Sequence, residues 1–271
     1  MNAGELADRL ETALAIARRA GALTLEYFNR GNYAVERKGD ATPVTDADRG
    51  AEQLLRADLA ARFPDDGVLG EEFPERPGSS GFRWIVDPID GTKSFITGVP
   101  LYGTLIGLEH HGRSVLGVIH LPALDETLWG LAGGDAWFAR GADAPRPARV
   151  STRATLAESV FCTSEVASFA KRGSADAYHA LEAAARITRT WGDCYGYSLV
   201  ATGRADVMVD PLMSVWDAAA LQPILEAAGG TFTDWRGRPT IHAGEGIATN
   251  GLLQAETLQI VAQHLGAPPA P

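Results

Sequence analysis

The stretch that decides the fold reads Trp84-Ile85-Val86-Asp87-Pro88-Ile89-Asp90-Gly91-Thr92. An apolar, strand-like run ends in a carboxylate, and a proline and a second carboxylate follow before a Gly-Thr pair that can open a helix. Two hard oxygen ligands beside a helix N-terminus suit a divalent cation and a phosphate together. Because Asp, Pro and Gly are also ordinary turn residues, the stretch alone leaves a metal site and a surface turn both open.

The whole chain has the composition of an ordinary globular protein. Its 271 residues are 45% hydrophobic and 21% charged, enough for one large domain or two modest ones. The net charge of -10 argues against a nucleic-acid binder, and two cysteines indicate no disulfide framework. No apolar run approaches the roughly 20 residues of a membrane span, and the N-terminus lacks a signal-peptide pattern. We therefore expect a cytoplasmic enzyme without a membrane partner.

Helix and strand patterns alternate along the chain, which predicts a mixed α and β class. Apolar residues recur every three or four positions over 4–29, and Thr45 with Asp48 forms a capping pattern that starts a second helix. The Ala- and Pro-rich segment 141–149 is the best candidate for a linker. The remaining predictions are strands at 82–86, 101–108, 115–121, 127–131, 159–163, 205–209, 231–235 and 246–249, and helices at 175–185, 195–202, 215–228 and 252–265.

Acidic residues gather at four places where elements are expected to begin or end. They are Asp46 with Asp48, the pair Glu71-Glu72, Asp87 with Asp90, and Asp217. The first could be only a helix cap and the second only a solvated loop pair. Asp217 lies in a largely apolar first turn, where a buried carboxylate needs a partner such as a metal. Clustered carboxylates without matching Lys or Arg favour Mg²⁺ or Mn²⁺ over zinc.

Together these motifs resemble the inositol monophosphatase family of Mg²⁺-dependent, lithium-sensitive phosphatases. The matching segments occur in family order over roughly residues 5–265: Pro43-Val44-Thr45-Asp46, Gly70-Glu71-Glu72, the stretch 84–92, and Trp216-Asp217-Ala218-Ala219. The resemblance implies a layered αβαβα sandwich and a homodimer. It implies an N-terminal α+β part (1–140) with most metal ligands and a C-terminal α/β part (150–271) with substrate-recognition residues, acting as one compact unit.

The resemblance also assigns two or three Mg²⁺ ions, with Mn²⁺ as an alternative. Glu71 and Asp87 would ligate the first metal together with the backbone carbonyl of Ile89. Asp87, Asp90 and Asp217 would hold the second.

Water and phosphate receive their own residues in the same way. Glu72, or Asp46 through water, would bind a third, weaker ion. The resemblance also implies a catalytic role for Glu72. Thr92 and Asp46 would orient or deprotonate the attacking water. The amides of Gly91 and Thr92 would hold phosphate oxygens. Lys38, in an expected loop, would screen phosphate or gate entry, unless it is an ordinary surface lysine.

Substrate choice is expected to depend on Asp193 and Asp210. The run Trp191-Gly192-Asp193-Cys194-Tyr195-Gly196-Tyr197 resembles the histidinol-phosphatase branch of the family. Two acids near the leaving group would favour a cationic alcohol, because a charge-assisted hydrogen bond is stronger than a neutral one. We therefore predict histidinol-phosphate hydrolysis. The alternatives are an inositol-phosphate or broad sugar-phosphate phosphatase, a noncatalytic regulatory protein on this fold, and, for Asp193, a helix N-cap.

Overall fold

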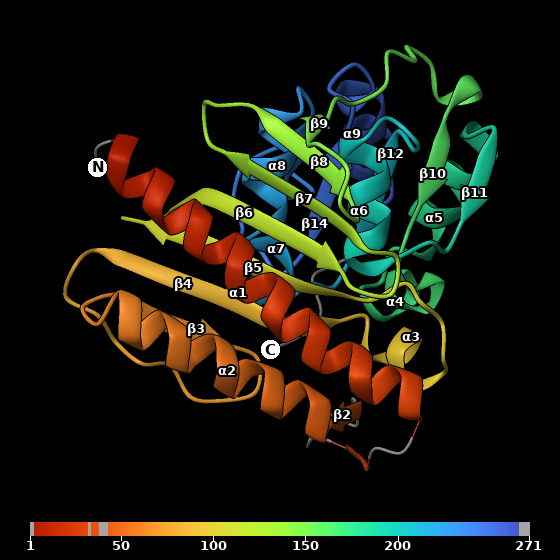
Figure 1. Cartoon of the computed structure of the whole chain (residues 1–271). Coiled ribbons are helices and arrows are strands. Elements are labelled where there is room, and N and C mark those ends of the chain that lie inside the picture. Colours follow the sequence, from red (N-terminus) through yellow and green to blue (C-terminus); the bar gives the residue numbers. More distant parts are fainter. Residues whose placement is uncertain (1–2, 32–33, 38–42, 266–271) are drawn as a thin grey trace.

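The computed structural model describes residues 3–31, 34–37 and 43–265, and these form five alternating layers of helices and sheets (Figure 1). The first sheet has the strand order β3-β4-β5-β6-β7-β8-β9. Its neighbours are antiparallel except for the parallel pair β3 and β4. The strands are β3 (Gly67–Gly70), β4 (Phe82–Asp90), β5 (Gly103–His110), β6 (Arg113–Leu121), β7 (Glu126–Leu131), β8 (Ala136–Arg140) and β9 (Arg146–Pro147).

The second sheet has the order β11-β10-β12-β14-β13, with β10 parallel to both of its neighbours. Its strands are β10 (Val160–Cys162), β11 (Ile187–Arg189), β12 (Val207–Asp210), β13 (Thr231–Thr233) and β14 (Gly246–Thr249). A separate antiparallel pair, β1 (Val35–Arg37) and β2 (Pro43–Thr45), precedes the second helix.

Helices supply the other three layers. The long α1 (Ala3–Arg30) and α2 (Asp46–Arg62) lie side by side on the outer face of the first sheet (Figure 1). Between the sheets lie α6 (Asp193–Ala201), α7 (Val215–Ala218) and α8 (Leu221–Ala227). The far side of the second sheet carries α5 (Ala175–Ala184) and α9 (Gln254–Gln263), with α4 (Val166–Lys171) packed beside α5. The predicted αβαβα sandwich is confirmed.

A row of glycines brings the middle layer unusually close to the first sheet. Gly107, Gly117 and Gly130 stand opposite one another on β5, β6 and β7. A Cβ on Gly117 would lie 2.0 Å from the carbonyl oxygen of Ala220, and one on Gly130 would lie 2.8 Å from the Cα of Ile224. The helix expected over 215–228 is wrong in detail: it divides into α7 and α8, and Ala219 and Ala220 at the break lie against this row.

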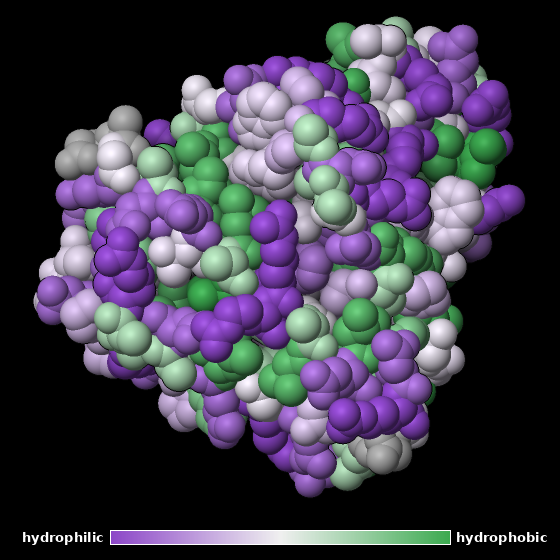
Figure 2. Space-filling view, viewed as in Figure 1, coloured by the Kyte–Doolittle hydropathy of each residue, from purple (hydrophilic) through white to green (hydrophobic). Residues whose placement is uncertain are grey.

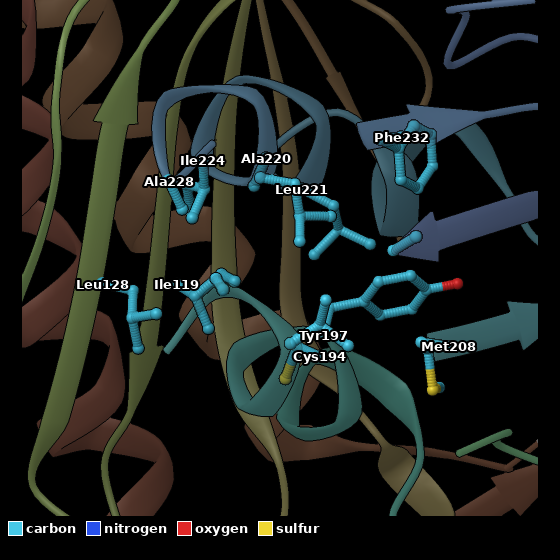
Figure 3. Packing of buried hydrophobic residues seen from close by; sticks show 14 of the residues in the cluster. Ile119, Leu128, Cys194, Tyr197, Met208, Ala220, Leu221, Ile224, Ala228 and Phe232 are labelled. Atoms are coloured by element: carbon cyan, nitrogen blue, oxygen red, sulfur yellow. The ribbon is translucent and has the colours of Figure 1, made fainter. Parts of the chain in front are cut away.

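The middle layer also joins the two sheets through apolar side chains. Figure 3 shows Ile119 and Leu128 of the first sheet facing Cys194, Leu221 and Ile224, with Met208 and Phe232 of the second sheet on the other side. Such close-packed apolar contact is the main stabilising contribution to a fold of this kind.

Several other sequence expectations can be compared with the structure. The helix beginning at Thr45 is confirmed: Thr45 is its N-cap, and Asp48 closes the capping box through the Thr45 amide at 2.7 Å. Segment 141–149, expected as a linker, connects the two sheets but contributes β9 to the first.

In the part of the chain that the structure describes, no helix is both long and apolar enough to cross a bilayer. Hydrophilic and hydrophobic residues are interspersed over the face in Figure 2.

One buried carboxylate fastens α1 to the first sheet. Asp66 accepts from Arg9 at 3.1 and 3.2 Å, from Trp84 Nε1 at 2.9 Å and from Ser80 Oγ at 2.6 Å. The Arg9 guanidinium also lies 3.9 Å from the centre of the Phe82 ring. Both charges of the pair are thus buried and fully engaged.

A buried histidine makes stability depend on pH. His120 of β6 packs against Gly21 of α1 and bonds Thr127 Oγ1 through Nδ1 at 3.0 Å. Burial lowers the pKa of His120 to about 4 from 6.5. Between those pH values His120 binds a proton in the unfolded chain but not in the folded chain, so the contribution of His120 to stability is fully present above pH 6.5 and is lost as the pH falls towards 4. We expect the free energy of unfolding of wild type to fall by about 3 kcal/mol more than that of His120→Gln between pH 7 and pH 4. Urea denaturation at a series of pH values measures the difference. Parallel profiles for the two proteins would contradict the assignment.

Candidate active site

A bulge in β4 brings two carboxylates to the same side of the strand. Residues three apart in a regular strand point to opposite faces. Between Asp87 and Asp90, however, two residues of β4, Pro88 and Ile89, stand opposite one residue of β5, Thr104. Pro88, which has no N–H for the ladder, lies in the bulge, and its carbonyl accepts from Thr104 Oγ1 at 2.9 Å. The Ile89 amide donates to Asp87 Oδ1 at 3.0 Å. Asp87 and Asp90 consequently share one site.

Asp217 completes this carboxylate cluster from the middle layer. It is the third residue of α7, and its side chain accepts from the Ser214 amide at 2.7 Å in a capping box. One carboxylate oxygen each from Asp87, Asp90 and Asp217 can be chosen so that all three lie within 4.8 Å of one another. Asp90 is tied to the middle layer as well, because it accepts from the amide of Cys194. The cluster therefore joins the first sheet to the helices behind it.

The electrostatics of the cluster suit a divalent cation. Burial raises the pKa of Asp87 well above its usual range, and Glu71, Asp90 and Asp217 add to the rise. Burial likewise raises the pKa of Asp90, with Asp193 and Asp217 contributing, and takes the pKa of Asp217 to about 7. Crowded carboxylate oxygens with little cationic compensation are a ligand set for hard cations such as Mg²⁺. These residues fit the metal that the sequence resemblance implies.

Glu71 reaches the same cavity from the end of β3, and a neighbouring glutamate holds its turn in place. Glu52 of α2 is buried and accepts from the amides of Glu72 at 2.7 Å and Phe73 at 3.3 Å. A Cβ on Gly70 would lie 2.1 Å from Glu52 Oε1, so the close approach requires glycine. The sequence reading missed Glu52, although its position four residues after the buried Asp48 places it on the same face of α2.

Gly91 and Thr92 open the short helix α3 (Thr92–Ile96) directly after the cluster. Gly91 has φ +87°, a conformation that side chains disfavour, and a Cβ there would lie 3.1 Å from Asp193 Oδ2. Thr92 Oγ1 donates to the carbonyl of Ile89 at 3.1 Å. The predicted phosphate-binding pair thus lies between the bulge and Asp193.

A cavity of about 730 Å³ collects most of the predicted site residues. Those lining it are Glu71, Asp90, Gly91, Thr92, Asp193, Asp210 and Asp217. Asp46 is exposed at the first position of α2 and, like Glu72, is not among the lining residues. Lys38 lies outside the described residues. The cavity is far larger than a phosphate needs, which leaves room for an alcohol group.

The two predicted substrate acids have different surroundings. Asp210, at the end of β12, accepts four hydrogen bonds: from Thr163 Oγ1 (3.2 Å), the Ser164 amide (2.8 Å), Ser164 Oγ (2.9 Å) and Tyr197 Oη (2.9 Å). Its two oxygens therefore have their usual complement of donors. Ser164, which the sequence reading missed, accepts in turn from the Asp193 amide at 2.8 Å. Asp210 thus positions Ser164 and, through it, Asp193.

Asp193 is held in a constrained backbone conformation beside the phosphate-binding pair. Its φ is +52°, in the left-handed region that side chains rarely adopt, and such strain concentrates at functional sites. Burial raises the pKa of Asp193 to about 6, with a further contribution from Asp210. Gly192 is the N-cap residue of α6, with no side-chain cap bond, so the alternative that Asp193 caps this helix is wrong.

Comparison with known proteins places this site in a family. The sequence profile described as "Inositol monophosphatase family" matches residues 5–265. The chain belongs to the inositol monophosphatase family. Among solved family structures, the extragenic suppressor protein suhB of Bartonella henselae has a TM-score of 0.86 at 30% identity, covering 94% of this chain and 98% of that one. An inositol monophosphatase from Zymomonas mobilis has a TM-score of 0.83 at 34% identity, with coverage of 97% and 100%.

Curated relatives within the inositol monophosphatase family carry a more specific name. A protein of Chlorobaculum parvum named histidinol-phosphatase is 49% identical over 89% of this chain and 91% of its own length. One of the same name from Mycobacterium tuberculosis is 40% identical over 93% of this chain and 96% of its own. The sequence-based identification of the family is confirmed, and the resemblance to the histidinol-phosphatase branch with it.

Proposed function

We propose that this protein is a Mg²⁺-dependent phosphate monoester hydrolase that converts histidinol phosphate and water to histidinol and phosphate, a step of histidine biosynthesis. The observation that carries the proposal is the cluster of Asp87, Asp90 and Asp217, of which Asp90 and Asp217 line one cavity together with Gly91, Thr92 and the half-buried Asp193. The names of the relatives at 49% and 40% identity support the choice of ester.

The proposed metal ligands are Glu71, Asp87, the Ile89 carbonyl, Asp90 and Asp217. Magnesium bound there would offset the charge of the phosphate dianion, lower the pKa of the attacking water and stabilise the leaving alkoxide. Because burial raises the pKa of Asp87, Asp90 and Asp217, binding the cation would release protons and would be favoured at higher pH.

Other residues are proposed to position the reactants. The amides of Gly91 and Thr92 hold the phosphate oxygens, and the Thr92 hydroxyl, fixed by its bond to the Ile89 carbonyl, orients the water. Asp46 and Glu72 assist around a third ion. For Lys38, which lies outside the described residues, the expectation that it screens phosphate or gates entry stays a prediction. Asp193 accepts a charge-assisted hydrogen bond from the cationic leaving group, and Asp210 supports it.

Water is proposed as the nucleophile, in direct in-line attack. A cysteine nucleophile requires a thiolate. Cys162 and Cys194 are both buried, and burial raises the pKa of Cys162 to about 12 and that of Cys194 well above its usual range. Neither thiol is therefore ionised near neutral pH.

A panel of phosphate esters tests the assignment. With Mg²⁺ present, we expect kcat/KM for histidinol phosphate to exceed that for inositol 1-phosphate by at least about 10²-fold, the discrimination that a few kcal/mol of differential transition-state binding gives. A preference for the inositol ester would establish instead the inositol-phosphate activity that the Zymomonas mobilis protein's name describes.

Asp193→Asn tests the recognition of the cation. The amide keeps the shape of the side chain and loses its charge, so KM for histidinol phosphate should rise about 10-fold or more. KM for glycerol 2-phosphate should change less than about twofold, because the alcohol part of this ester has no positive charge for Asp193 to bind. Equal changes for both esters would remove Asp193 from substrate recognition.

We also propose that residues 1–140 and 150–271 act as one unit and that the protein is a homodimer. The packing of α6 and α8 against both sheets supports the first point. Sedimentation velocity of the full chain tests the second, with a monomeric mass as the contrary result.

A further inference from the structure

Three charged side chains that line the cavity meet between α3 and the start of α4. Lys93 Nζ donates to Glu165 Oε2 at 3.0 Å, and Lys171 Nζ lies 3.6 Å from the same oxygen. The side chains of Lys93 and Glu165 are 68% and 40% exposed. An ion pair this exposed contributes at most about 1 kcal/mol to the free energy of unfolding. Stability alone therefore does not explain why the ion pair lies beside the cavity.

The charge of the cavity wall indicates what Lys93 can do. Among the described residues, the lining side chains that carry positive charge are Lys93 and Lys171. The acidic lining residues are Glu71, Asp90, Glu165, Asp193, Asp210 and Asp217. A phosphate dianion entering this cavity meets a mainly negative wall, and Lys93 directly follows Thr92 of the proposed phosphate-binding pair.

The Lys93 side chain is also free to change partners. An ammonium on a four-carbon stem is a flexible point charge with three donors, and exposed lysines reorient readily. Glu165 has further polar neighbours, since Ser168 Oγ donates to it at 3.3 Å and Lys171 is close. Losing Lys93 would therefore leave Glu165 solvated and still partnered.

We propose that Lys93 binds the phosphate group of substrate and product, and that Glu165 competes with phosphate for the Lys93 ammonium. The proposal rests on the proposed function, since it concerns the phosphate of that reaction. In this structure the ammonium lies on Glu165, and on binding phosphate it would move to the phosphate oxygens. Glu165 thereby weakens the hold on the product and speeds its release.

The test compares two variants of the full, Mg²⁺-loaded protein by calorimetric titration with inorganic phosphate. Lys93→Met should raise the phosphate Kd about 10-fold, because a charge-assisted contact is lost. Glu165→Gln should lower it about 3-fold or more, because Lys93 is released from its competitor. The inhibition constant of phosphate should follow the same opposite directions. Lys171→Met, a matched removal of the second lysine, should change Kd less than Lys93→Met does.

The directions of the two changes in phosphate Kd separate phosphate binding by Lys93 from a purely structural role of the ion pair. If the pair only fastens α3 to α4, both substitutions break the same bond and shift the phosphate Kd in the same direction or not at all, which would overturn the proposal. The ester panel judges the proposed function separately. A wild-type protein that binds phosphate but prefers inositol 1-phosphate would refute the histidinol assignment and leave the Kd comparison valid.

Discussion

Asp90→Asn is expected to lower kcat/KM for histidinol phosphate by about 10³-fold or more while leaving the fold intact. Asp90 belongs to the carboxylate cluster with Asp87 and Asp217, and the amide has no charge with which to hold a divalent cation. Losing the cation there removes several kcal/mol of transition-state stabilisation, equivalent to about 10³-fold or more in rate. Steady-state kinetics across a magnesium titration measure the loss.

The same substitution should stabilise the metal-free protein. Burial and the neighbouring acids disfavour the ionised form of Asp90, and an asparagine oxygen can still accept from the Cys194 amide. We expect the Tm of the metal-free variant at pH 8 to rise by about 2–4 °C, the shift that about 1 kcal/mol produces in a chain of this size. Activity falling together with a lower metal-free Tm would indicate a folding defect and contradict the assignment as a metal ligand.

Asp66→Ala is expected to have the largest effect on stability, a loss of about 3–5 kcal/mol in the free energy of unfolding. The substitution leaves the Arg9 guanidinium buried without its counter-ion and removes the acceptor of Trp84 Nε1 and Ser80 Oγ. Urea denaturation followed by tryptophan fluorescence measures the change. Because Asp66 is not among the residues lining the cavity, KM at a temperature where the variant is folded should remain as in wild type.

A surface ion pair supplies the control for Asp66. Glu26 and Arg30 of α1 lie 3.2 Å apart with side chains that are 62% and 65% exposed. Glu26→Ala should therefore cost no more than about 0.5 kcal/mol. If both substitutions cost the same, burial of the Asp66 pair is not the source of its contribution.

Sequence reasoning succeeded where the information is local. The periodicity over 4–29 predicts α1, and the pattern of Thr45 with Asp48 predicts the start of α2, because helix faces and caps depend on residues a few positions apart. The strand expected to end at Val86 instead continues to Asp90. Its continuation depends on a bulge formed against β5, a partner that the local pattern does not specify.

The same distinction applies to the site. Acidic residues in short motifs could be found from their spacing and from the family they resemble. Ser164 and Glu52 act through bonds to the backbone of distant segments, at Asp193 and Glu72. A serine and a helical glutamate are common everywhere, so only the folded arrangement distinguishes these two. The row of glycines against which Ala219 and Ala220 pack is likewise a property of three paired strands.

The wide separation of the carboxylates along the chain has a consequence for how the protein is assembled on the ribosome. Asp87 and Asp90 emerge from the ribosome long before Asp217, and α7 must dock on the first sheet before the three can meet. A cation that is held by all three carboxylates can therefore bind only after α7 has docked on the first sheet.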